Sequence, residues 1–191
     1  SWGVQAPLMA VAVDIVVLTI TDGRLQVALV ERGIAPFEGA PALPGGFVLQ
    51  EESVIGAARR ELVEETGLDL GATHLEQLAT FGDPGRDPRG RVISVAHLAL
   101  AASLGGLTPG SDAAGARWCP VQDVPALAFD HDEILRAGIE RARAKLEYTT
   151  IATRFCGPQF TMTELRQVYE AAWGVEVDAR NFSRKVLGSR G

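Results

Sequence analysis

The stretch from Gly45 to Leu68 constrains the fold of this chain more than any other part of it. Its second half predicts a helix, because Ser53 suits an N-cap, residues 54–65 are rich in strong helix formers and Gly67 suits a helix end. Apolar residues recur on one side of this helix at helical spacing and are expected to face a core: Ile55, Ala58 and Leu62.

The same helix carries a cluster of glutamates beside its apolar stripe. At about 100° per residue, Glu61, Glu64 and Glu65 share an arc of roughly 100°, and Glu52 stands just before the helix. A solvated acidic helix face is one interpretation of this pattern. One observation argues against this interpretation. Glu61 and Glu65 form a like-charge i,i+4 pair without an opposing Lys, and such a pair destabilises a helix by roughly a few tenths of a kcal/mol.

The loop before the helix favours a metal-binding interpretation. Gly45 and Gly46 bring bare backbone close to the carboxylates. Hard oxygen ligands with an open approach suit Mg²⁺ or Mn²⁺, which keep water ligands and bind substrate phosphates. The sequence therefore predicts a divalent-metal element in this helix.

The spacing of these residues resembles the Nudix box at every defined position. Gly46 is followed after five residues by Glu52, and after seven more by residues 60–68, RELVEETGL. The Nudix family cleaves nucleoside diphosphates linked to another group, using divalent metal. The resemblance implies that Glu64 and Glu65 are the main metal ligands. It also implies that the Gly45 carbonyl and Glu52 assist, that Glu61 is a ligand or the catalytic base, and that Arg60 orients the glutamates.

Composition sets wider limits. With 191 residues and 47% hydrophobic content, the chain can form one full core and a small second unit. The net charge of −6 argues against a wholly nucleic-acid-binding surface, although a local basic patch remains compatible with it. Two cysteines predict no disulfide framework and fit a reducing, cytoplasmic compartment. The apolar run 8–20 contains Asp14 and is too short to span a membrane, so no membrane partner is expected.

Apolar runs and turn residues predict strands that alternate with two helices. The expected strands are 8–20, 25–30, 75–81, 92–100 and 117–119. A second helix is expected from Asp132 to about Leu146, capped by Asp130, with one apolar stripe: Ile134, Leu135, Ile139 and Ala142. This order fits the Nudix α/β/α sandwich and ends near residue 147.

An arginine-containing loop lies between the third and fourth expected strands. Arg86, Arg89 and Arg91 alternate there with Gly, Pro and Asp. The loop is either a polar hairpin connection or a second clamp on a diphosphate, since arginine matches phosphate geometry bidentately.

Other polar residues near the expected site have two interpretations each. A solvated strand end is favoured over ligand contact for Glu31 and Arg32. A capping or packing role is favoured over an acid–base role for His131, and Asp112 is a candidate acidic contributor to the site.

The last segment, 150–191, has a different character. It holds six basic and four acidic residues, so that it is positive while the rest of the chain is negative. Thr161 and Glu164 form a capping box for a helix that ends near Trp173, and Asp178 caps a second helix over 179–187. Two short helices joined by a tight glycine turn predict a helix-turn-helix.

The second of these helices displays basic and amide side chains that suit a DNA major groove: Arg180, Asn181, Ser183, Arg184 and Lys185. The alternative is a helical appendage that packs on the first domain or on a second subunit. A winged helix would add a wing hairpin after Leu187, and the sequence ends four residues later. The wing is therefore expected to be truncated or absent.

Several segments together resemble the Nudix-related transcriptional regulators of NAD metabolism. They are LEQLATFGDPGRDPRGRVISVAH, FDHDEIL, KLEYTTIA and FTMTELRQVYEAAWGVEVDARNFSRKVL. The resemblance implies a Nudix-type domain over 1–147 that binds ADP-ribose and a winged-helix domain over 148–191 that binds operator DNA as a dimer. It places Gly45, Gly46 and the three loop arginines near the ligand.

Two functions follow. The favoured one is a repressor of NAD-metabolism genes that ADP-ribose, or a related nucleoside diphosphate compound, releases from DNA. The alternative is a Mg²⁺-dependent ADP-ribose pyrophosphatase whose C-terminal helices dimerise. Members of the regulator family often have an eroded Nudix box, whereas the box here is complete, so the enzyme question stays open. Mg²⁺ or Mn²⁺ is expected if hydrolysis is retained, and a homodimer is expected in either case.

Overall fold

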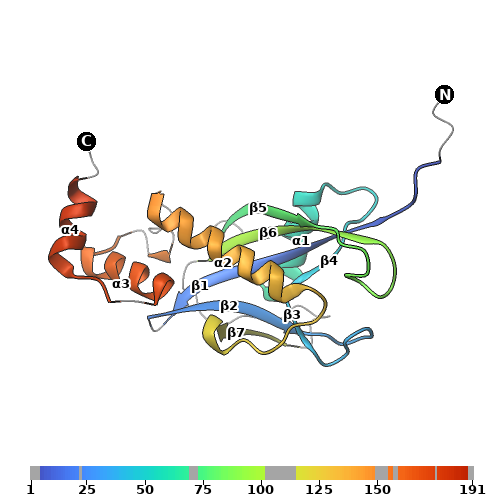
Figure 1. Ribbon diagram of the computed structural model, residues 1–191, viewed down its shortest axis with the longest axis horizontal. Helices are drawn as coiled ribbons and strands as arrows, with labels where there is room; N and C mark the ends of the chain where they lie inside the picture. The colour runs from blue at the N-terminus through green and yellow to red at the C-terminus, as the bar shows by residue number, and fades with distance from the viewer. Residues whose placement is uncertain are drawn as a thin grey trace.

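The computed structural model describes residues 5–21, 23–68, 73–101, 115–148, 155–156, 159–174 and 176–188. These residues form a mixed sheet with a helix on each face and two further helices at one end (Figure 1). The strands are β1 (Ala10–Thr21), β2 (Arg24–Glu31), β3 (Pro41–Ala42), β4 (Gly45–Phe47), β5 (Thr73–Phe81), β6 (Val92–Ala101) and β7 (Ala116–Pro120). The helices are α1 (Val54–Thr66), the short 3₁₀ helix η2 (Val121–Asp123), α2 (His131–Tyr148), α3 (Met162–Trp173) and α4 (Ala179–Gly188).

Strand β1 is the centre of the sheet. The main order is β3-β2-β1-β6-β5, with β4 paired to β1 and β7 paired to β2. Strands β1 and β6 are parallel, and β1 is antiparallel to both β2 and β4. The run from Ile15 to Leu18 is fully buried, as expected for a strand that is covered on both faces.

Helix α1 covers one face of the sheet and has the caps that the sequence predicts. The Ser53 side chain accepts a hydrogen bond from the Gly56 N–H, and Gly67 ends the helix in the left-handed conformation, with φ 67°. Ala58 and Leu62 are fully buried. The prediction for Ile55 was wrong, because this residue, in the first turn of the helix, is 38% exposed.

Helix α2 covers the opposite face and completes the expected α/β/α sandwich (Figure 1). Ile134, Ala142 and Leu146 pack into the core. Gly138 allows a close approach, since a Cβ atom there would lie 2.6 Å from Val16 Cγ1. Asp130 lies just before the helix, where a cap was expected, but its carboxylate binds Arg86 of a distant loop.

Helices α3 and α4 form the predicted helix-turn-helix at the far end of the sheet from the N-terminus (Figure 1). The capping box of Thr161 and Glu164 is present, and Gly174 ends α3 in the left-handed conformation. The Asp178 side chain accepts a hydrogen bond from the Asn181 N–H at the start of α4. The pair packs on the main core through four buried side chains: Leu165, Val168, Ala172 and Phe182.

Three smaller points complete the fold. Neither Cys119 nor Cys156 is in a disulfide. In the part of the chain that the structure describes, no helix has the length and apolar character needed to cross a membrane. Asp112 lies outside the described residues, as does the side chain of Lys185.

Candidate ligand pocket and DNA-facing helix

The glycine loop lies directly against the glutamates of α1. The Gly45 N–H donates to Glu65 Oε2 over 2.9 Å. A Cβ atom on Gly46 would overlap the Glu61 carboxylate, and one on Gly45 would overlap the Val13 carbonyl. Only glycine therefore fits at position 45, and a larger residue at position 46 would displace the Glu61 carboxylate, which agrees with the close approach expected from the sequence.

Arg60 lies at the centre of the glutamate cluster. Its guanidinium contacts Glu52 over 2.6 Å, Glu61 over 2.6 Å and Glu64 over 3.3 Å. The ion pair with Glu52, the largest contribution, helps raise the pKa of Arg60 above its usual range. Within the described residues, no group of three or more His, Cys, Asp or Glu side chains is arranged to hold a metal ion.

The two glutamates nearest the glycine loop are unusually easy to protonate. Burial raises the pKa of Glu65 to about 7, the charges of Glu61 and Asp14 add to the rise, and the Gly45 N–H opposes it. Burial also raises the pKa of Glu61, although Arg60 opposes this rise. A nearby cation would favour the ionised form of both carboxyls.

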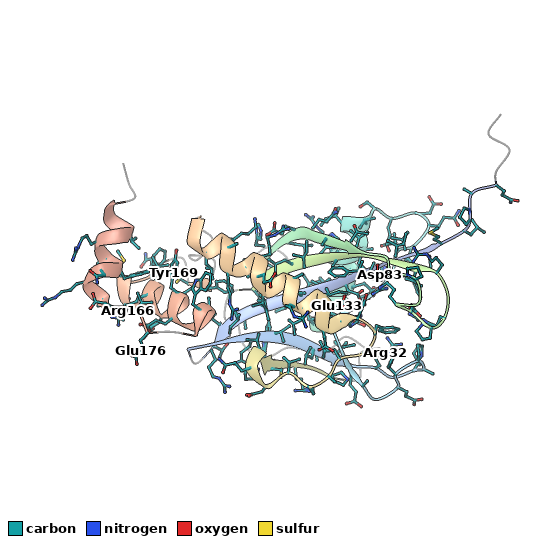
Figure 2. The ribbon with its side chains drawn as sticks, viewed as in Figure 1. Arg32, Asp83, Glu133, Arg166, Tyr169 and Glu176 are labelled. Atoms are coloured by element: carbon teal, nitrogen blue, oxygen red, sulfur yellow. The ribbon has the colours of Figure 1, made fainter. Side chains whose placement is uncertain are left out.

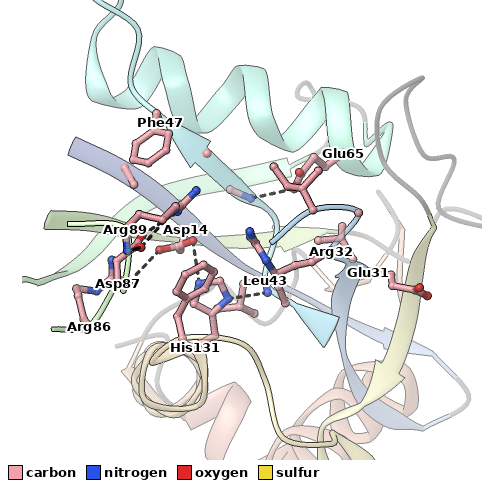
Figure 3. A pocket seen from close by; sticks show the side chains of 18 residues that line it. Asp14, Glu31, Arg32, Leu43, Phe47, Glu65, Arg86, Asp87, Arg89 and His131 are labelled. Atoms are coloured by element: carbon pink, nitrogen blue, oxygen red, sulfur yellow. Dashed lines mark hydrogen bonds and ion pairs between the residues drawn. The ribbon is translucent and has the colours of Figure 1, made fainter. Parts of the chain in front are cut away.

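A pocket of about 320 Å³ opens beside this cluster (Figure 3). It is formed where the first half of β1, the end of β2, β4, the arginine-containing loop and the start of α2 meet. Its charged and aromatic lining consists of Asp14, Glu31, Arg32, Phe47, Glu65, Arg86, Asp87, Arg89, Phe129 and His131. Both signs of charge and three rings therefore face one cavity.

Arg86 is the most deeply placed cation of the pocket. Its side chain is only 4% exposed and forms two hydrogen bonds with the Asp130 carboxylate, of 2.7 Å and 2.6 Å. It also lies 3.5 Å from Asp14. Burial alone would lower the pKa of Arg86, but its pairing with Asp130 and Asp14 raises this pKa.

Two further arginines stack on aromatic rings at the pocket wall. The Arg89 guanidinium is held by Asp87 over 2.7 Å and lies 4.9 Å from the centroid of the Phe47 ring. The Arg32 guanidinium lies 4.7 Å from the centroid of the Phe129 ring. These cation–π contacts hold both guanidinium groups at the pocket wall, where their N–H groups can bind an anion.

His131 connects three elements at the bottom of the pocket. Its Nδ1 accepts a hydrogen bond from the Leu43 N–H over 3.0 Å, which places the proton on Nε2, 3.2 Å from Asp14 Oδ1. Burial alone would raise the pKa of Asp14, but His131, Ser94 and Arg86 hold this pKa below its usual range. Asp14 is therefore an ionised, fully partnered carboxylate in the pocket wall.

The structure brings together most of the ligand-binding residues that the sequence predicted. Gly45, Gly46, Arg86 and Arg89 line the pocket. Arg91 is not among the lining residues and donates to the Gly82 carbonyl at the base of its own loop.

Three residues for which the sequence favoured another role also line the pocket: Glu31, Arg32 and His131. Glu31 is the exposed last residue of β2, as the solvated-strand-end interpretation predicted, and Arg32 next to it is half-buried. Ligand contact by either residue stays a prediction. His131 does pack as predicted, but it packs in the pocket wall.

Sequence reasoning missed several lining residues. Asp14 had a signal, since it is the one acidic residue within a strongly apolar strand. Phe47, Asp87 and Phe129 had no comparable signal, because the three-residue strand β4 that carries Phe47 and the loops that carry the other two are positioned by tertiary packing.

The predicted DNA-facing side chains are displayed on α4. Arg180, Asn181 and Arg184 are exposed, Ser183 is half-buried, and Phe182 on the opposite side is buried against Tyr169. Arg184 donates to Asn181 Oδ1 over 3.2 Å. A polar, basic face thus points outward from the helix-turn-helix.

Comparison with known protein families places both parts of the chain. The model of the NUDIX domain matches residues 9–138. The chain belongs to the Nudix family. A second model, the NrtR DNA-binding winged helix domain, matches residues 152–190. This Nudix protein therefore has the domain content of the Nudix-related regulators of NAD metabolism.

Two characterised relatives resemble different extents of the Nudix protein. The ADPR responsive transcriptional repressor NtrR of Acinetobacter baylyi is 33% identical over 188 residues, which is 96% of this chain and 74% of the relative. An ADP-ribose pyrophosphatase of Methanocaldococcus jannaschii is 42% identical over 127 residues, which is 66% of this chain and 71% of the relative. The repressor similarity extends over the C-terminal helices.

Solved structures also match either nearly the whole chain or its Nudix domain alone. A MutT/nudix family protein from Enterococcus faecalis matches with a TM-score of 0.85 and 32% identity, over 97% of this chain and 82% of its own. Shewanella oneidensis NrtR complexed with a 27mer DNA matches with a TM-score of 0.78 and 31% identity, over 94% and 83%. The NUDIX domain of that NrtR complexed with ADP ribose matches with a TM-score of 0.66 and 34% identity, over 72% and 90%.

Proposed function

We propose that this protein is a DNA-binding repressor of NAD-metabolism genes, released from its operator by ADP-ribose. The observation that carries the proposal is the winged-helix match over residues 152–190, with an exposed basic face on α4. The similarity to a repressor that responds to ADP-ribose extends over nearly the whole chain. In this role α4 enters the major groove, where Arg180 and Arg184 contact phosphate or guanine and Asn181 contacts adenine.

The pocket suits a nucleoside diphosphate linked to a sugar. Its arginines supply cationic, planar donors for the diphosphate: Arg32, Arg86 and Arg89. Phe129 and Phe47 offer aromatic rings, and the exposed Glu31 carboxylate offers an acceptor for sugar hydroxyls. A volume of about 320 Å³ is in the range of small-ligand sites.

Hydrolysis of the same ligand is the second candidate function, and the complete Nudix box favours it. Nudix hydrolases generally use a divalent metal, and the carboxylates of Glu61, Glu64 and Glu65 with the Gly45 carbonyl have the oxygen-donor chemistry that Mg²⁺ or Mn²⁺ requires. When bound, the ion supplies charge stabilisation at the phosphoryl oxygens and lowers the pKa of a ligated water. Arg60 now binds Glu61 and Glu64, so it would give up these contacts to free them.

The two functions separate in one experiment. The protein would be tested in a gel-shift assay with promoter DNA of NAD-biosynthesis genes, with and without ADP-ribose, at fixed near-physiological salt. AMP in the same samples would be followed by chromatography. We expect a specific shift that ADP-ribose abolishes. Absence of any sequence-specific shift at moderate salt would overturn the proposed repressor function.

The enzyme question has its own test. Mg²⁺-dependent AMP release that falls strongly in Glu64→Gln and Glu65→Gln would assign hydrolysis to these residues. Equal release by wild type and both variants would show that the metal ligands are wrongly assigned.

We further propose the assembly and the location. A two-fold operator needs two recognition helices, so the protein should be a homodimer, with the Nudix domain over 1–147 and the winged helix over 148–191 in each subunit. The DNA-binding role favours a cytoplasmic location, as in cells whose chromosome lies in the cytoplasm. A monomer by sedimentation at micromolar concentration would contradict the dimer.

A further inference from the structure

Helix α2 touches the ligand pocket with its first turn. His131, its first residue, lies in the pocket wall between Asp14 and the Leu43 N–H. Asp130, just before the helix, binds one edge of the buried Arg86 guanidinium through Nε and Nη2. The start of α2 is therefore connected to the pocket by four polar contacts, two of which are the hydrogen bonds from Arg86.

The other end of α2 is joined to α3 by a reciprocal pair of hydrogen bonds. The Tyr169 hydroxyl of α3 donates to the Leu146 carbonyl in the last turn of α2, over 2.5 Å. Arg143 of α2 donates from Nε to the Ala172 carbonyl in the last turn of α3, over 2.8 Å. The last carbonyls of a helix have no partner within it, so each helix satisfies one such carbonyl of the other.

The two ends lie far apart. Eighteen residues of helix rise about 27 Å, from the pocket to the helix-turn-helix. Figure 2 shows Arg32 of the pocket and Tyr169 of α3 on opposite sides of the molecule, with α2 running between them. Between its ends α2 is in close contact with the sheet, because Gly138 lies against the fully buried Val16.

We propose that α2 transmits the ligand signal, with the Arg86–Asp130 pair as its input and the Arg143 and Tyr169 hydrogen bonds as its output. The proposal rests on the repressor function above and names how that function is regulated. A diphosphate that binds Arg86 competes with the Asp130 carboxylate for the same guanidinium edge, because both are planar or tripodal oxygen acceptors. The start of α2 then loses the ion pair between Asp130 and Arg86.

A helix is stiff and moves as a unit, so a displacement of its first turn also displaces its last turn. The close contact at Gly138 acts as a pivot, and a small rotation about it displaces Leu146 and Arg143 relative to α3. Since α3 holds α4 through the Tyr169–Phe182 contact, the two recognition helices of a dimer change their spacing. Ligand and operator thereby favour different positions of one element, which is what coupling between two sites requires.

The test compares coupling with ligand affinity in the full chain. The operator probe would be a duplex enriched by the wild-type protein from a random-sequence library. For each variant, the operator Kd is measured with and without saturating ADP-ribose, and the ADP-ribose Kd is measured by calorimetry without DNA. The variants are Tyr169→Phe, which removes only the hydroxyl, and Tyr169→Phe combined with Arg143→Gln.

For the wild type, ADP-ribose should weaken operator binding by a factor in the range of about 5 to 150. In the double variant this factor should fall at least threefold, while the ADP-ribose Kd stays within twofold. Arg136→Gln is the matched control, because Arg136 is an exposed arginine of the same helix, and its coupling factor should equal that of the wild type. Circular dichroism would establish that each variant is folded.

The outcomes separate the inference from the function on which it rests. A wild type that binds no operator, or whose binding ignores ADP-ribose, overturns the proposed function and the inference with it. A responsive wild type with an unchanged factor in both Tyr169 variants overturns the inference alone. A control variant that loses coupling to the same extent also overturns it, since the effect would then not belong to the α2–α3 contacts.

Discussion

Glu65 has a residue-scale consequence that can be measured without any ligand. Its pKa is raised to about 7 in the folded protein, above the ordinary value of a glutamate, so folding favours the protonated form. The stability that this gives is present at low pH and is lost as pH rises through about 7. At pH 8 the buried, ionised Glu65 therefore destabilises the fold.

Glu65→Gln should raise the melting temperature at pH 8 by roughly 2–4 °C, equivalent to about 1 kcal/mol, and change it little at pH 5. Thermal unfolding followed by circular dichroism at both pH values would measure this. Glu64→Gln is the control, because Glu64 is exposed and its replacement should have no such pH-dependent effect. Equal changes at the two pH values for Glu65→Gln would contradict the assignment.

The arginine-containing loop allows a second residue-scale prediction. Arg89 lines the pocket, whereas Arg91 is outside it. Arg89→Gln should weaken ADP-ribose binding by roughly 10- to 150-fold, since a hydrogen bond to a charged group contributes roughly 1.5–3 kcal/mol. Calorimetric titration of Arg91→Gln should give nearly the wild-type Kd. A larger loss for Arg91→Gln than for Arg89→Gln would mean that the pocket is misplaced.

At the scale of elements, helix α2 depends on one glycine. A Cβ atom at position 138 would lie 2.6 Å from Cγ1 and 2.8 Å from Cβ of Val16, which is fully buried and β-branched and so cannot turn aside. Gly138→Ala should lower the free energy of unfolding by about 1–3 kcal/mol through overpacking. Urea denaturation would measure the change.

Val16→Ala should partly restore the stability that Gly138→Ala loses, because the smaller side chain makes room for the new methyl group. The double variant should be more stable than the sum of the two single effects predicts. Strict additivity in the urea experiment would show that the two residues are not in contact.

Elements were predictable where their signals are local. The ends of α1 and α3 follow from a capping side chain and a closing glycine, Ser53 with Gly67 and Thr161 with Gly174, and the structure has all four in those roles. The glutamate cluster and its glycine loop followed from fixed spacing. The pocket did not, because Arg86 reaches Asp130 across 44 positions of sequence and His131 reaches Leu43 across 88. Such pairings are set by the packing of β1, β2 and α2 together.

Exposure was predictable only in part for a similar reason. Helical spacing places Ile55 with Ala58 and Leu62, but Ile55 in the first turn of α1 is exposed, whereas the other two are fully buried. Periodicity gives the direction of a side chain and not the extent of the surface opposite it.

At the scale of the whole molecule, charge is divided between the two parts of the chain. The net charge is −6, although residues 150–191 hold more basic than acidic side chains. DNA is therefore repelled by most of the surface and attracted at the helix-turn-helix, where Arg180 and Arg184 are exposed on α4. Because few cations are available to contact DNA, the affinity for the operator should fall only modestly as salt rises. The fall can then be assigned to individual side chains.

This division makes the last prediction quantitative. The slope of log K against log salt for operator binding reports the number of phosphates that the protein neutralises. If Arg184 contacts phosphate, Arg184→Gln should weaken binding to all sequences alike and reduce the slope by about 1. If it contacts a guanine edge, the slope should change less and discrimination at one base position should relax. Arg59→Gln, which removes the same charge from an exposed position on α1, is the control. An equal loss of slope in both variants would mean that the net charge of the chain, and not α4, governs the approach to DNA.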